Sequence, residues 1–155
     1  MKIEIGDILK KLGAHKEISF EENMHLEYID FAGPVKGYVK ITNVGGRIFA
    51  EGTLITKVKL NCCRCCEDFV SAAETNLREE FLDGKSDQVR SMSEEDLEDL
   101  QGFIYNDDSI DLKEAIRQNM ITALPVNPVC NEKCRGICVV CGKNKNIEKC
   151  DCPSA

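Results

Sequence analysis

Ten cysteines, gathered in two clusters, constrain this chain more than any other feature of its sequence. Two cysteines separated by two residues in a tight turn point both sulfur atoms at one place, which suits a Zn2+ ion with four ligands. Cys62-x2-Cys65 upstream has this spacing, although Cys63-x2-Cys66 offers a rival register in the same run. The other six cysteines fall within the last 26 residues, at Cys130, Cys134, Cys138, Cys141, Cys150 and Cys152.

An even number of cysteines in a small protein is also typical of a secreted disulfide framework. Residues 1–20 are charged throughout and lack the unbroken apolar stretch of a signal peptide. We therefore expect a cytoplasmic protein, in which clustered thiols bind metal more often than they are oxidised. The expected cofactor is Zn2+, one or two ions per chain. Iron–sulfur ligation is a weaker alternative because neither ferredoxin spacing is present.

Length and charge limit the fold and the partners. A chain of 155 residues suits one domain, or one domain with a small metal-bound lobe, and no stretch is apolar enough to span a membrane. The net charge of −7 argues against general nucleic-acid binding. Residues 83–111 alone carry ten acids and two cations, whereas the cysteine-rich tail is mildly basic. We expect the acidic segment to form a solvated loop or, alternatively, a docking site for a basic partner.

Alternation of apolar and polar residues predicts strands over 35–41 and 48–60, joined by a turn at 43–46. A weaker pattern predicts a third strand over 69–81. If it pairs with the second strand, Cys62 and Cys65 lie at the turn between them.

Two helices are expected. Residues 5–12 have apolar residues at helical spacing and end at Gly13. The clearer helix covers 110–124, with Asp111 and Glu114 as a capping-box pair at its start and Pro125 at its end.

The fold class that follows is α+β: an antiparallel sheet or partial barrel, a few helices, and a cysteine-rich C-terminal tail held by zinc. Residues 1–124 form the body, with the acidic loop 83–109 inserted in it. Residues 125–155 form the metal-binding tail, packed on the body.

Three blocks of sequence resemble the YceD family, whose members are linked to the accumulation of large-subunit ribosomal RNA. The first is the run 60–69 around Cys62 and Cys65. The second includes Ile110-Asp111-Leu112, residues 114–118 and Leu124-Pro125. The third is the cysteine tail, from Cys130 to the closing Cys150-Asp151-Cys152. The resemblance covers residues 60–152, and the family's usual pattern has no cysteine at positions 63 and 66.

The resemblance implies eight metal ligands, enough for two tetrahedral sites. Geometry suggests that the hairpin turn and the segment after the helix meet at the first site, while the tail closes the second. The first site is then Cys62, Cys65, Cys130 and Cys134, and the second is Cys138, Cys141, Cys150 and Cys152. Cys63 and Cys66 are expected to be small buried side chains. In an alternative arrangement only the tail binds metal.

The function implied by the resemblance is that of a non-catalytic ribosome-biogenesis factor, whose partner is pre-ribosomal RNA or a ribosomal protein. We expect any RNA contact to use cations near the cysteines: Lys57, Lys59, Arg64, Lys133, Arg135, Lys143 and Lys145. One alternative is a thiol-based redox sensor, in which Arg64 favours thiolates among its neighbouring cysteines. The other is an enzyme of unidentified activity, for which His15 and His25 lack a recognisable partner.

Overall fold

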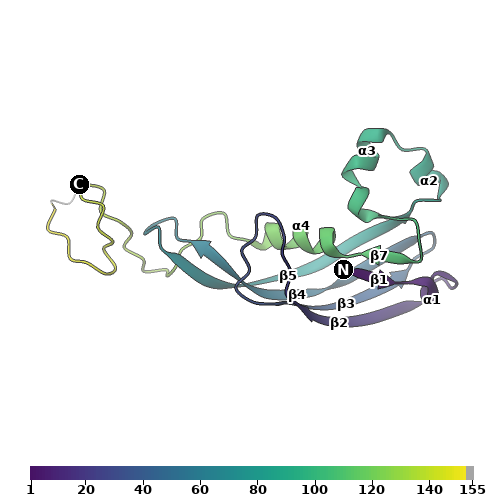
Figure 1. Ribbon diagram of the computed structural model, residues 1–155, viewed down its shortest axis with the longest axis horizontal. Helices are drawn as coiled ribbons and strands as arrows, with labels where there is room; N and C mark the ends of the chain where they lie inside the picture. The colour runs from purple at the N-terminus through teal and green to yellow at the C-terminus, as the bar shows by residue number, and fades with distance from the viewer. Residues whose placement is uncertain (153–155) are drawn as a thin grey trace.

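A long twisted hairpin, part of an open sheet, dominates the computed structural model, which describes residues 1–152 (Figure 1). The five-stranded sheet has the order β2-β3-β4-β5-β6, and every neighbouring pair is antiparallel except the short parallel pair β5–β6. The predicted α+β class is confirmed, with an open sheet rather than a partial barrel. The strands are β2 (His15–Glu22), β3 (Val35–Asn43), β4 (Arg47–Asn61), β5 (Asp68–Asp83) and β6 (Ile104–Tyr105).

The hairpin of β4 and β5 is paired along its whole length, from Arg47↔Leu82 to Asn61↔Asp68. Its core-facing side chains alternate along each strand, as the sequence pattern requires, and Leu54, Leu77 and Phe81 are almost completely buried. The three predicted strands are therefore confirmed, and the hairpin ends where the first cysteine cluster begins.

Helix α4 (Lys113–Ala123) packs against β5 through an apolar stripe, in which Ile116 and Met120 are fully buried. The predicted helix starts too early, because Ile110 and Asp111 belong to strand β7 (Ser109–Asp111), which pairs with β1 (Lys2–Glu4). Asp111 is not the N-cap, which is Leu112 without a side-chain capping bond, but its Oδ1 accepts a hydrogen bond from the first helical amide, Lys113 N, at 2.9 Å.

The predicted capping box of Asp111 and Glu114 is wrong. Glu114 accepts a hydrogen bond from Arg117 Nε at 2.8 Å, so its carboxylate points along the helix instead of back to the cap. A cation three residues further along the same helix face competes with the backbone amide for this side chain.

The N-terminal helix is also shorter than predicted: α1 (Gly6–Leu9) is a single turn, and Leu12 is 72% exposed. The edge strand β2 follows it, which the sequence reasoning missed. Only Ile18 and Phe20 mark its inner face, so the alternation is too short to stand out from a charged segment.

The acidic segment contains three short helical turns: α2 (Asp87–Arg90), α3 (Glu94–Asp99) and η1 (Gln101–Phe103). Ser86 and Ser93 cap the first two, since each hydroxyl accepts a backbone N–H three residues later. These turns lie at the end of the elongated molecule opposite the cysteine tail (Figure 1). None of the helices over residues 1–152 is long and apolar enough to cross a membrane.

Candidate metal centres

The tip of the β4–β5 hairpin carries Cys62 and Cys65 in a tight turn. The backbone N of Cys66 donates to the O of Cys62 at 2.9 Å and closes this turn. The segment after α4 reaches the same place, because Cys63 N donates to Pro128 O at 2.8 Å. Residues that are about 65 positions apart in the chain are thereby brought side by side.

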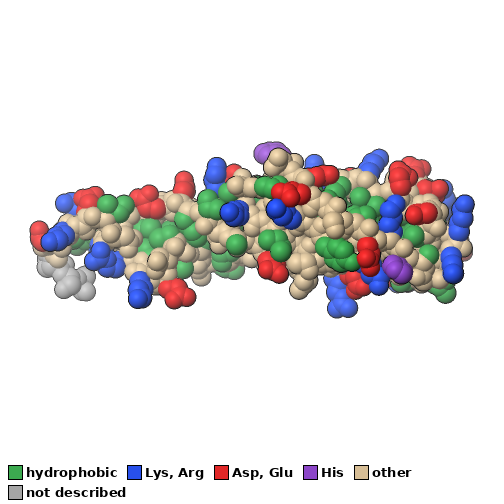
Figure 2. All heavy atoms as spheres, turned by 90° about the horizontal axis from the view of Figure 1, so that it is seen from below, with side chains coloured by type: hydrophobic (Ala, Val, Ile, Leu, Met, Phe, Trp, Pro, Cys, Tyr) green, Lys and Arg blue, Asp and Glu red, His purple; other side chains and the backbone are tan. Residues whose placement is uncertain are grey.

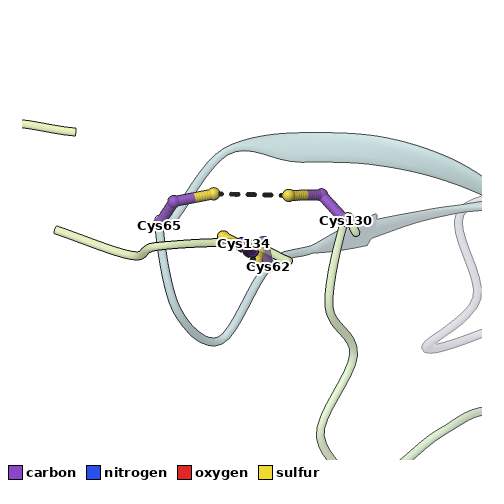
Figure 3. A group of neighbouring side chains, drawn as sticks. All are labelled: Cys62, Cys65, Cys130 and Cys134. Atoms are coloured by element: carbon purple, nitrogen blue, oxygen red, sulfur yellow. Dashed lines mark hydrogen bonds between the residues drawn. The ribbon is translucent and has the colours of Figure 1, made fainter. Parts of the chain in front are cut away.

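The first thiol group consists of Cys62, Cys65, Cys130 and Cys134 (Figure 3), whose sulfurs all lie within 4.8 Å of one another. Two of the Sγ···Sγ distances are 3.9 Å, for Cys62 and Cys134, and 3.6 Å, for Cys65 and Cys130. Sulfurs bound at about 2.3 Å to one tetrahedral Zn2+ lie about 3.8 Å apart. A disulfide would require about 2.05 Å. The spacing therefore fits a metal ion between the sulfurs and not a covalent bridge.

The second thiol group, Cys138, Cys141, Cys150 and Cys152, is equally compact, with all sulfurs within 4.8 Å. Cys141 and Cys150 are 3.6 Å apart at Sγ. All ten cysteines of the chain are free thiols in the structure. The structure thus gathers the same two sets of four that the sequence grouped, and each set could hold one metal ion.

The turns of the two thiol groups have the same backbone conformation. Gly142 N donates to Cys138 O at 2.8 Å, which matches the bond from Cys66 to Cys62 upstream. The residue after the second cysteine has a positive φ in both turns, 73° for Gly142 and 60° for Cys66. Cys66 therefore stands where this turn favours glycine.

The expectation that Cys63 and Cys66 are buried is wrong, since both are exposed. The turn points Cys62 and Cys65 inward, where they are 0% and 4% exposed. Cys63 and Cys66, each the next residue in the chain, therefore face solvent. The rival register Cys63-x2-Cys66 does not contribute to either group.

Hydrogen bonds to sulfur make some of these thiols readily ionised. Backbone N–H groups, first that of Cys130 and then those of Cys65 and Arg64, lower the pKa of Cys62 to about 6 against the opposing effect of burial. In the second group, the N–H groups of Cys141 and Val140 lower the pKa of Cys138 to about 6. Such N–H donors favour the thiolate, which is the form that binds metal.

Crowding has the opposite effect on one thiol of each group. Desolvation and the neighbouring thiols, of which Cys65 acts most strongly, raise the pKa of Cys130 to about 12. Cys141 and Cys150 raise the pKa of Cys152 to about 12 in the same way. Four thiolates this close repel one another, and a divalent cation among them would remove that cost.

Arg64 belongs to the hairpin tip and contacts the tail. Its guanidinium donates from Nη1 to the carbonyl oxygens of Glu132 and Cys134, at 3.2 and 3.3 Å. Its own carbonyl accepts from Ile137 N at 3.0 Å. A Cβ on Gly136 would come within 2.9 Å of that same oxygen, so the tail passes very close to the hairpin. Arg64 therefore connects the two parts of the chain.

Of the other cations predicted to contact RNA, two form ion pairs with acids. Lys59 Nζ is 3.7 Å from Asp30 Oδ2, and Lys143 Nζ is 3.7 Å from Glu148 Oε2. Arg135 and Lys145 border a hollow of about 670 Å3 beside the second thiol group. Lys57 and Lys133 are exposed on β4 and on the tail respectively.

Sequence reasoning also missed one residue that contacts a candidate centre. Asn146 donates from Nδ2 to the Sγ of Cys134 at 3.2 Å, and Asn144 Oδ1 accepts from the same Nδ2 at 2.9 Å. The cysteine spacing carries no signal for Asn146, because asparagine is common in turns for other reasons. His15 and His25 are exposed and belong to neither thiol group.

An open-sheet α+β body that carries two four-thiol groups at one end defines a cysteine-rich protein with two candidate metal centres. Residues 50–155 match the family model described as large ribosomal RNA subunit accumulation protein YceD, and the chain belongs to this family. The resemblance seen in the sequence is thereby confirmed.

Two plant relatives carry that description in their names. The chain is 27% identical over 142 residues to the chloroplastic large ribosomal RNA subunit accumulation protein YCED homolog 1 of Zea mays, with 77% of this chain and 48% of the maize protein covered. The Arabidopsis thaliana protein of the same name is 26% identical over 140 residues, with 77% and 44% covered. The chain thus spans about half the length of these relatives.

A bacterial relative is similar over more of the chain. An uncharacterized protein of Mycobacterium tuberculosis is 27% identical over 150 residues, which cover 92% of this chain and 69% of that protein. No solved structure is significantly similar to the chain.

Proposed function

We propose that this chain is a non-catalytic ribosome-biogenesis factor of the cytoplasm, which supports accumulation of large-subunit ribosomal RNA by binding pre-ribosomal RNA or a ribosomal protein. The observation that carries the proposal is the match of residues 50–155 to a family named for that accumulation. The family name describes an accumulation factor and no reaction, so the proposal contains no catalytic step.

The proposed role of the two thiol groups is to bind structural zinc. A site with four thiolate ligands leaves no open position for water or substrate, so its metal contributes folding free energy instead of catalysis. The Sγ···Sγ distances of 3.6–3.9 Å support zinc. The lowered pKa of Cys62 and of Cys138 agrees with them, because it favours the thiolate that binds metal.

Metal analysis of protein purified without chelator tests the zinc proposal. Two Zn2+ per chain are expected. One Zn2+ per chain, retained in the Cys62→Ser variant and lost in Cys141→Ser, would support the alternative in which only the tail binds metal. A metal-free protein that is nevertheless folded over residues 130–152 would contradict structural zinc.

The distribution of charge supports one candidate surface for each kind of partner. The acidic segment 83–111, with a net charge of −8, lies at one end and suits a basic protein tail. At the other end, a hollow of about 670 Å3 is bordered by the exposed Val139 and Val140, by three cations and by two acids. Arg135, Lys145 and Lys149 outnumber Glu148 and Asp151 there, so RNA is the partner that this weakly basic hollow suits better. On the face shown in Figure 2, cationic and acidic side chains alternate along the whole length, so that face has no continuous basic patch.

Recovery of partners from cells tests the function as a whole. A tagged full chain is expected to enrich pre-ribosomal RNA of the large subunit, or a ribosomal protein, as identified by RNA sequencing and mass spectrometry. The cysteine-to-serine variants that lose zinc serve as controls: they show whether this enrichment requires a folded tail. Enrichment of neither kind of partner would contradict the proposal.

RNA crosslinking distinguishes an RNA partner from a protein partner. If the tail binds RNA, Lys145→Glu reduces RNA crosslinking several-fold, because a phosphate contact is replaced by repulsion. Lys85→Glu, an equal charge change on an exposed residue of the acidic segment, leaves crosslinking unchanged. Equal crosslinking of both variants and the wild type would direct the search to a protein partner.

One observation favours a thiol-based redox response as a second candidate. Cys63 and Cys66 are exposed beside Cys62 and Cys65, so an oxidant reaches them before the buried thiols. Peroxide treatment is then expected to lower the thiol count and release metal, and Cys63→Ser with Cys66→Ser is expected to slow the release. An unchanged thiol count with full metal retention would exclude this function.

A further inference from the structure

Asn146 belongs to the loop of the second thiol group, between Cys141 and Cys150, but its side chain contacts the first group. Its Nδ2 donates to the Sγ of Cys134 at 3.2 Å. Cys134 is 8% exposed and lies in the small apolar cluster at the hairpin tip. A side chain that one group holds in place therefore contacts a candidate metal ligand of the other.

The orientation of the Asn146 amide follows from its second contact. The backbone N of Arg135 donates to Asn146 Oδ1 at 2.8 Å. A backbone N–H can only donate, so the atom that faces it must be the amide oxygen, and the NH2 group must face the sulfur. Asn144 Oδ1 accepts from both the backbone N and the Nδ2 of Asn146, at 3.0 and 2.9 Å. Both amide protons thus have acceptors.

The backbone around Asn146 is positioned by the second group. Lys145 N donates to Gly136 O at 2.9 Å, and Cys138 N donates to Lys143 O at 2.8 Å. Cys138 begins the turn that presents two of the four thiols of the second group. Closure of that group around an ion would therefore hold the loop, and with it the Asn146 amide, in the observed place.

We propose that Asn146 is a positioning residue for the first metal centre, so that metal binding at the second centre strengthens metal binding at the first. This inference rests on the structural zinc of the proposed function. An N–H donor to a thiolate ligand strengthens with the charge of its acceptor. Groups that hydrogen-bond metal ligands typically change metal affinity by about 10–100-fold. Because binding free energies are reciprocal, metal at the first centre strengthens the second by the same factor.

The variant Asn146→Asp removes both hydrogen bonds that the Asn146 amide group donates, to Cys134 Sγ and to Asn144 Oδ1. Aspartate has the same shape and keeps an acceptor for Arg135 N, but it replaces the donor to Cys134 with a carboxylate oxygen. In the full chain, competition with a chelator is expected to show zinc at the first centre bound about 10–100-fold more weakly. With cadmium-113 as the probe, only one of the two NMR resonances is expected to shift strongly.

Asn131→Asp is the matched control. It makes the same charge change in the loop between Cys130 and Cys134, and its Oδ1 still accepts from Lys133 N, at 2.8 Å in the native chain. This variant is expected to bind zinc like the wild type. Equal weakening by both variants would mean that added negative charge, and not the lost donor, is the cause, and it would overturn the inference.

The coupling itself is tested by disabling the second centre with Cys138→Ser and Cys141→Ser. The first centre should then bind zinc about 10–100-fold more weakly, and adding Asn146→Asp should cost little more. The inference would be overturned if the double cysteine variant left the zinc affinity of the first centre unchanged. It would also be overturned if the losses of affinity caused by the double cysteine variant and by Asn146→Asp added fully. Both outcomes would leave structural zinc intact. A wild-type protein that binds no zinc would overturn both.

Discussion

At the scale of single residues, the backbone conformation of Cys66 is the least expected feature of the hairpin tip. Its φ of 60° lies in the left-handed region, which costs an L-residue about 1–2 kcal/mol relative to glycine. The equivalent position of the second thiol group is Gly142, with a φ of 73°. The comparison of the two turns indicates that Cys66 is strained and that glycine at this position would relieve the strain.

The variant Cys66→Gly is therefore expected to raise the free energy of unfolding by about 0.5–1 kcal/mol, because relief of strain exceeds the added entropy of glycine in the unfolded chain. Urea denaturation of the metal-loaded protein measures this. Metal content is expected to stay at the wild-type value, since the Cys66 thiol belongs to neither group. Gly142→Ala is the reverse change and should destabilise. Loss of one metal ion in Cys66→Gly would show that Cys66 is a ligand.

At the scale of elements, α4 both completes the core and directs the chain toward the hairpin tip. Its stripe of Ile116 and Met120 covers β5, and Leu124 ends it with an extended backbone, ψ 138°, as expected before Pro125. The sequence predicted this helix well because its apolar spacing is regular over three turns. It did not predict the strand β7 before it, since Ile110 pairs with Ile3, more than 100 residues away.

Replacement of Met120 with alanine is expected to destabilise the body by about 2–4 kcal/mol, because the side chain is fully buried and its removal leaves a cavity. Gln118→Ala, on the exposed side of the same helix, should change stability by less than about 0.5 kcal/mol. Guanidinium denaturation followed by circular dichroism compares the two. Similar small losses in both variants would mean that packing of Met120 on β5 contributes little to holding α4 in place, since alanine itself favours the helix.

At the scale of the whole molecule, the hydrophobic core and the cysteine tail are stabilised in different ways. The main cluster of buried apolar residues extends from Ile5 to Met120, with Leu124 packed at its edge, and includes none of the tail residues 125–152 that the structure describes. Of these, Cys134 and the half-buried Val129 belong to the small second cluster at the hairpin tip. So small a cluster provides little burial free energy, so under the proposed zinc binding the tail depends on its two metal centres.

Removal of metal by a chelator is therefore expected to unfold the tail and leave the body folded. Limited proteolysis should then cleave within residues 130–152, while the sheet signal in circular dichroism persists. A body variant that keeps the thiols, such as Met120→Ala, is the control, because its tail should stay protected in the presence of metal. Simultaneous loss of the sheet signal and of tail protection would show that metal stabilises the whole chain as one unit.

Local patterns in the sequence determined the strands β3, β4 and β5, the helix α4 and the tight cysteine turns at 62–65 and 138–141, because alternation, helical spacing and tight turns act over a few residues. The eight candidate ligands came from the family resemblance. The tertiary structure alone decided which groups meet across long separations. It turned Arg64 toward tail carbonyls, placed Cys63 and Cys66 in solvent, and set Asn146 against Cys134. Such contacts depend on where the hairpin tip and the tail come together in space, and no short stretch of residues encodes that.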